Sequence, residues 1–129
     1  MRTWPLLLLL WLAAPAYACG PDWIDRVELD DGLTLVYRTQ PSPIELTQPF
    51  VLHLRFCRDD KIVEVDNLKL DATMPAHGHG MNYEPSIKKR SEGEYETIGM
   101  LFHMPGAWRV EFTYEFDGSR RQARFNIDL

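Results

Sequence analysis

From residue 26 onward the chain alternates apolar and polar residues with a period of two, which is typical of β-strands that bury one face. In the segment 50–56 the two faces are Phe50, Leu52, Leu54 and Phe56 on one side and Val51, His53 and Arg55 on the other. The segment 108–116 has one continuous apolar face, formed by Trp108, Val110, Phe112, Tyr114 and Phe116. Segments 26–30, 33–39, 62–74, 83–90, 94–102 and 122–129 are predicted as further strands, and no window shows a helical period.

Turn residues separate these segments. Asp31-Gly32 and Asp117-Gly118 are signals for two-residue hairpin turns. Pro85 indicates that 83–90 is an edge strand, because proline cannot donate to a strand ladder. The pattern therefore predicts an all-β fold, an immunoglobulin-like antiparallel sandwich of two sheets with seven or eight strands. The last strand is expected to turn Ala123, Phe125, Ile127 and Leu129 inward.

The N-terminus has the features of an export signal. An apolar run at 5–14 lies between Arg2 and the A-x-A sequence Ala16-Tyr17-Ala18. The run is too short for a comfortable membrane-spanning helix. We therefore expect residues 1–18 to be a secretory signal peptide and residues 19–129 to form a single domain in the periplasm, with no transmembrane anchor.

Only two cysteines are present, Cys19 and Cys57. An oxidising export compartment favours a disulfide between them, and their spacing resembles no zinc or redox motif. Lipidation of Cys19 is the alternative, because this residue directly follows the predicted cleavage point. Lipoprotein signals usually place a Leu-like residue three positions before the cysteine and a small residue two before, whereas this chain has Ala16 and the bulky Tyr17 there.

The negative charge of the chain limits the kinds of molecule that it is expected to bind. Its formal net charge is −5, and loss of residues 1–18 would remove Arg2 and no acidic residue, leaving 13 basic and 19 acidic residues. An acidic surface argues against nucleic acid or anionic lipid as the partner and favours cations, metal ions among them.

A cluster of soft and imidazole side chains occupies the stretch "MPAHGHGM" at 74–81, which Pro75, Gly78 and Gly80 mark as a loop. Its candidate ligands are Met74, His77, His79 and Met81. Thioether and imidazole together suit copper, above all Cu(I), whereas calcium and magnesium require oxygen ligands. The alternative interpretation is that the loop is merely polar and that Met74 is a core residue, since it continues the apolar face of 68–72.

A second patch, "GMLFHMPGAW" at 99–108, adds His103. Alternation places Met104 with Met100 and Phe102 on the face that packs in the core, and His103 on the opposite face at the end of the strand. His103 would approach His77 and His79 if both turns lie at the same end of the sandwich. His53 lies mid-strand on an outer face, where a solvated or hydrogen-bonded role is expected.

The residues "MPAHGHGM" followed by "GEYETIGMLFHMPGAWRVEF" resemble the YtkA-like family of small exported domains, which are related to FixH-like proteins. The resemblance covers roughly residues 45–129. It implies an architecture similar to immunoglobulin-like copper carriers and a role in copper handling or cytochrome oxidase assembly, with Met74, His77, His79, Met81 and His103 as site residues. FixH proteins retain a membrane-spanning helix, whereas only a cleavable signal is expected here, which argues against an oxidase-bound role.

Two functions are therefore open. The first is a periplasmic metal-binding protein, a copper carrier or buffer that uses the His/Met loop, with Cu(I) favoured over Cu(II) and a copper-requiring periplasmic or membrane protein as partner. The second is a metal-free exported interaction module or respiratory oxidase assembly factor. Enzyme activity is not expected, because no serine lies in an elbow-like turn and the cysteines are predicted to be structural.

Overall fold

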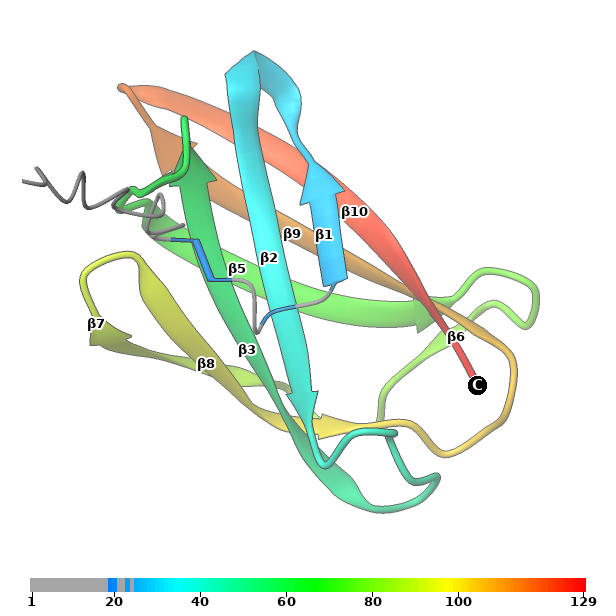
Figure 1. Cartoon of the computed structure of the whole chain (residues 1–129). Coiled ribbons are helices and arrows are strands. Elements are labelled where there is room, and N and C mark those ends of the chain that lie inside the picture. The colour runs from blue at the N-terminus through cyan, green and yellow to red at the C-terminus, as the bar shows by residue number, and fades with distance from the viewer. Residues whose placement is uncertain (1–18, 21–22, 24) are drawn as a thin grey trace, which may run out of the picture.

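The computed structural model describes residues 19–20, 23 and 25–129, and it confirms the predicted all-β sandwich. Figure 1 shows two antiparallel sheets packed face to face. The larger sheet has the order β1-β2-β3-β8-β7, with the short β4 paired to β3. Its strands are β1 (Asp25–Glu28), β2 (Leu33–Gln40), β3 (Pro49–Arg58), β4 (Lys61–Ile62), β7 (Ser86–Ser91) and β8 (Glu94–Leu101).

The smaller sheet has the order β10-β9-β5-β6. Its strands are β5 (Asp66–Met74), β6 (His79–Gly80), β9 (Ala107–Phe116) and β10 (Ser119–Asp128). The predicted run 62–74 is therefore divided, because β4 belongs to one sheet and β5 to the other. β7 lies at the edge of the larger sheet, as Pro85 predicted.

The two predicted hairpin turns differ in outcome. Asp117 and Gly118 are the only residues between β9 and β10, and both have positive φ (50° and 73°), as a type I′ turn requires. The turn at Asp31-Gly32 is longer than predicted. There Asp30–Gly32 form a short 3-10 turn, η1, between Leu29 and Leu33, and the Leu29 N–H donates to the Leu33 carbonyl at 2.8 Å.

The core lies between the inner faces of the two sheets. Alternating residues of β3 and β9 are buried as the pattern predicted, with Leu52, Phe56 and Trp108 fully inaccessible to solvent. Tyr37 stacks on Phe125 at 4.2 Å between ring centres and so joins the sheets. At the end of the chain fewer side chains are buried than the alternation predicted. Ala123 and Ile127 are only partly buried, and Leu129 is exposed.

A second, small apolar cluster covers the outer face of the larger sheet. The predicted disulfide between Cys19 and Cys57 is present, with Cα atoms 6.2 Å apart, a usual span for a disulfide. Both cysteines are buried together with Val36. Trp23 packs on this cluster, and the guanidinium groups of Arg38 and Arg55 lie 5.2 Å and 4.3 Å from its ring centre. Cys19 and Trp23 therefore shield part of a face that alternation alone assigns to solvent.

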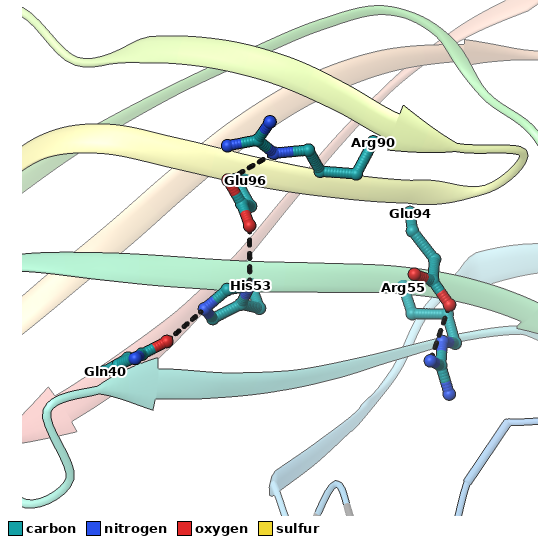
Figure 2. A network of polar contacts seen from close by, with 6 residues as sticks. All are labelled: Gln40, His53, Arg55, Arg90, Glu94 and Glu96. Atoms are coloured by element: carbon teal, nitrogen blue, oxygen red, sulfur yellow. Dashed lines mark hydrogen bonds and ion pairs between the residues drawn. The ribbon is translucent and has the colours of Figure 1, made fainter.

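His53 lies beside this cover in a network of polar side chains (Figure 2). Its Nε2 is 3.2 Å from Oε1 of Gln40, and its Nδ1 is 3.5 Å from a carboxylate oxygen of Glu96. Arg90 and Arg55 pair with Glu96 and Glu94, each at 2.5 Å. His53 is thus hydrogen-bonded on the outer face, as expected, but it is only 9% exposed and so is not solvated.

Burial lowers the pKa of His53 below the usual histidine range, and the positive charge of Arg38 lowers it further. The carboxylate of Glu96 opposes this shift. Because the unfolded chain then binds the proton more readily than the folded protein, the free energy of unfolding should fall as the pH drops below about 6.5.

This acid sensitivity should be smaller in His53→Gln. The measurement is the urea midpoint at pH 7.5 and at pH 5.5 in the native protein and the variant. His77→Gln serves as the control, since His77 is exposed at a loop. An equal loss of stability on acidification in the native protein and in His53→Gln would show that His53 does not cause it.

The predicted signal peptide, residues 1–18, lies outside the described residues. In the part of the chain that the structure describes, no helix is long and apolar enough to cross a membrane.

Candidate functional site

The hairpin that joins β5 to β6 sets the directions in which the side chains of His77 and His79 point. Met74 is the cross-strand partner of His79, so a four-residue loop, 75–78, separates them. The N–H groups of His77 and Gly78 donate to the Met74 carbonyl at 3.1 Å and 3.0 Å. Directly opposed residues of an antiparallel pair project to the same face of the sheet. His79 therefore shares the inner face with buried Met74, whereas His77 is exposed at the loop. Part of the predicted loop is thus the short strand β6.

The turn between β8 and β9, residues 102–106, carries His103. The N–H of Thr47 donates to the Phe102 carbonyl at 2.8 Å. Gly106 and Leu129 exchange two backbone hydrogen bonds, at 2.9 Å and 3.0 Å. Both the 102–106 turn and the 75–78 loop lie at the end of the sandwich that carries the C-terminus (Figure 1). The turn is therefore held in place from both sides, beside the β5–β6 hairpin.

The structure brings the three loop histidines into one row. The ring centres of His79 and His103 are 5.2 Å apart, and those of His77 and His79 are 5.8 Å apart. Nε2 of His79 and Nδ1 of His103 are buried and have no hydrogen-bond partner among the described residues. Buried polar atoms nearly always have a partner. These two nitrogens are therefore the atoms of this row that are best placed to accept a ligand.

Trp108 forms the inner boundary of the row. Its ring centre lies 6.4 Å from that of His79 and 5.4 Å from that of His103. The indole Nε1 donates to the Met104 carbonyl at 3.0 Å, and Phe102 stacks on the indole at 4.4 Å. The core position of Trp108 follows from alternation, but its place beside the histidines does not. Alternation predicts that its side chain faces inward, but not what lies next to it.

The methionines are placed differently from one another. Met74 is 1% exposed, and its Cε approaches Gly106 so closely that a Cβ there would lie 3.0 Å away. Gly106 also has a φ of 127°, which residues other than glycine rarely adopt. Met81 packs on the core and lines a groove between β5 and β7. Met104 is only partly buried, so the predicted core role holds in part.

The remaining candidates stand apart from this row. The cysteines are paired in the disulfide and hence are not free thiolates. Across the described residues, no group of three or more histidine, cysteine, aspartate or glutamate side chains is arranged to hold a metal ion. A metal bound here would accordingly rely on two imidazoles supplemented by other groups, or on a movement of exposed His77.

Comparisons with known proteins agree with this fold. A DUF4785 family protein from Legionella pneumophila subsp. pneumophila str. Philadelphia 1 is similar in structure, with a TM-score of 0.53 at 11% sequence identity over 77% of this chain. This chain matches 28% of the length of that protein, and at this identity the likeness shows the fold alone. Comparison with curated proteins gave no match.

The sequence profile described as YtkA-like matches residues 31–113. The match begins earlier and ends earlier than the resemblance seen in the sequence, and it includes the histidine row, Met74, Met81 and Trp108. It covers more than half of the chain, and the chain therefore belongs to the YtkA-like family.

Proposed function

We propose that this protein is an exported copper-binding protein, a carrier or buffer without catalytic activity, in which His79 and His103 are the principal ligands. His77 and the thioether of Met74 are the further candidates. Cu(I) is the favoured ion and Cu(II) the second. The proposed partner is a periplasmic or membrane protein that requires copper.

One observation carries this proposal. The ring centres of two imidazoles, one on β6 and one on the 102–106 turn, lie 5.2 Å apart, and each ring has a buried nitrogen without a partner among the described residues. Leaving such a group unpaired costs about 1 to 3 kcal/mol. A cation shared by the two rings would satisfy both nitrogens at once.

The spacing of the rings fits a shared ion. A metal about 2.0 Å from one nitrogen of each imidazole sets the ring centres about 5 to 6 Å apart. The distance between His79 and His103 lies in this range, as does that between His77 and His79. The ring distances are therefore compatible with a site on either pair, but the unpartnered nitrogens favour the pair of His79 and His103.

The ligand set favours copper over zinc. Structural zinc sites take four ligands from cysteine, histidine and carboxylate side chains, whereas the proposed ligands are two or three histidines and a thioether. Soft thioether ligands select Cu(I). Met74 is the candidate thioether ligand, because its methyl group reaches Gly106 in the 102–106 turn that carries His103.

Copper affinity in a set of single histidine variants tests the proposal. The exported protein is titrated against a Cu(I)-specific chromophoric chelator under reducing conditions that leave the disulfide intact. His79→Ala and His103→Ala should each weaken Cu(I) binding by more than about 100-fold, because even outer partners of metal ligands contribute 10- to 100-fold. His77→Ala should have a smaller effect, since its ring is exposed.

His53→Ala is the matched control, because His53 is a histidine in the polar network on the outer face of the larger sheet. It should leave the copper affinity unchanged. Unfolding midpoints of the metal-free variants separate loss of ligands from loss of fold. Unchanged affinity in both His79→Ala and His103→Ala would rule this pair out as the site.

The metal-free interaction module remains the second candidate, and one observation favours it. A groove of about 710 Å³ runs between β5 and β7, lined by Leu68, Leu70 and Met81 and bordered by exposed Tyr83. Lys69, Asp71 and Glu84 also line the groove, and a surface that combines apolar and charged side chains in this way suits a protein partner. Absence of copper binding in the native protein would leave this candidate standing.

A further inference from the structure

The geometry points to Trp108 as a wall of the proposed site, whose indole face attracts the bound cation and restricts the site to soft monovalent ions such as Cu(I) and Ag(I). This inference rests on the proposed function and names the class of ion that the same site takes. It gives Trp108 a role in specificity in addition to its place in the core.

The first step is the position of the indole. In the antiparallel pair of β5 and β9, Thr73 lies opposite Arg109, and the same register sets Met74 opposite Trp108. Across β5 and β6, Met74 in turn opposes His79. Trp108, Met74 and His79 therefore form a row across the inner face of the smaller sheet. Trp108 is fully buried in this row, which makes it a fixed boundary.

The second step is the orientation of the indole. The hydrogen bond from Nε1 to the Met104 carbonyl uses the only polar atom of the ring. Phe102 stacks nearly parallel to the indole, with an angle of 10° between the planes. The contacts with His79 and His103 consequently involve only the ring surface and its edge. Toward a cation, Trp108 can therefore offer π electrons but no lone pair.

The third step is the distance between the shared cation and the indole ring. The three separations among the rings of His79, His103 and Trp108 are 5.2, 6.4 and 5.4 Å. They place the midpoint between the two imidazoles about 5 Å from the indole centre, within the limit of about 6 Å for a cation–π contact. A cation shared by the two imidazoles lies about 2 Å from this midpoint, because the two metal-to-ring-centre distances together exceed 5.2 Å, and it is within reach of the indole when it lies on the Trp108 side.

The fourth step is selectivity. A divalent ion loses much more hydration energy on burial than a monovalent one and needs anionic or additional lone-pair ligands to replace it. The cluster of His79, His103, Trp108, Met74 and Phe102 contains no carboxylate. Imidazole, thioether and an aromatic face therefore suit a soft ion of single charge.

Fluorescence can test this contact directly. Trp23 and Trp108 are the two tryptophans outside residues 1–18, and Trp23 lies on the outer face of the other sheet. The variant Trp23→Phe of the exported protein leaves Trp108 as the reporter. Ag(I) is the probe, because it is redox-inert and does not absorb indole emission. One equivalent of Ag(I) should quench most of the Trp108 fluorescence, whereas one equivalent of Zn²⁺ should leave it unchanged.

Affinity supplies the second readout. Trp108→Leu should weaken Ag(I) binding by about 5- to 30-fold, the range from an exposed to a desolvated cation–π contact, and Trp108→Phe should weaken it less because a ring remains. Zn²⁺ binding should be weak in all variants. If Trp108→Leu does not fold, Trp108→Phe and the quenching in Trp23→Phe still decide the matter.

The outcomes distinguish the two proposals. Ag(I) binding that requires His79 and His103 but changes neither the fluorescence nor the affinity of Trp108 variants would overturn the role of Trp108 and leave the metal site intact. Zn²⁺ binding as tight as that of Ag(I) would also overturn the inference. If neither Ag(I) nor Cu(I) binds the native protein, the proposed function fails, and the inference fails with it.

Discussion

Replacing both Cys19 and Cys57 with alanine should lower the free energy of unfolding by about 4 kcal/mol, the chain-entropy value for a loop of this length. The two cysteines are separated by 38 residues in sequence. The bridge holds the N-terminal segment over Val36 and the outer face of β3, so its loss should also loosen the packing of Trp23. The measurement is chemical denaturation of the native protein and of the double variant.

The native protein treated with a reductant is the matched control. Reduction should produce the same loss of stability as the double substitution, and it should have no effect on the double variant. A native protein that carries a free thiol, and whose stability does not respond to reductant, would contradict the disulfide. Lipidation of Cys19 would then be the better explanation, and mass measurement would reveal it.

Met74→Ala should lower the free energy of unfolding by about 2 to 5 kcal/mol, the usual cost of truncating a buried methionine. Met74 is 1% exposed and lies in the row between Trp108 and His79. Met104→Ala should cost less, because Met104 is only partly buried. Thermal or urea denaturation of the metal-free variants provides the comparison. A larger loss in Met104→Ala than in Met74→Ala would mean that the assignment of the two side chains is wrong.

Met74→Leu separates packing from metal binding. Leucine nearly conserves the volume, so the variant should lose less than about 1.5 kcal/mol. If the thioether of Met74 contributes to Cu(I) binding, the affinity should fall in Met74→Leu although the fold is retained. Equal affinity in the native protein and in Met74→Leu would restrict the site to the imidazoles and Trp108.

Much of the fold follows from local sequence features. Period-two alternation predicts β3, β8 and β9 and the side chains that they bury, because successive residues of a strand face opposite sides. The hairpin at Asp117-Gly118 follows from residues that tolerate positive φ. With only two cysteines and an oxidising compartment predicted, the pair Cys19–Cys57 follows as well.

Local features were less informative where another segment covers a strand. His53 and Val36 alternate onto the outer face, yet both are buried. Cys19 and Trp23 cover this face, where Cys19 is bonded to Cys57 and two arginines flank Trp23. Alternation describes one strand, and it contains no information about a segment that packs on the sheet from elsewhere in the chain.

For the candidate site, the sequence by itself determined the residue types, the loop position of His77 and the strand-end position of His103. Only the tertiary structure decided that His79 faces inward while His77 is exposed, because that depends on the pairing of Met74 with His79 across the hairpin. The approach of His103 to within 5.2 Å of His79, and the place of Trp108 beside both, likewise depend on contacts between distant segments. The physical reason is that side-chain direction is a local property of the backbone, whereas the meeting of two loops is set by sheet register and by the packing of one sheet on the other.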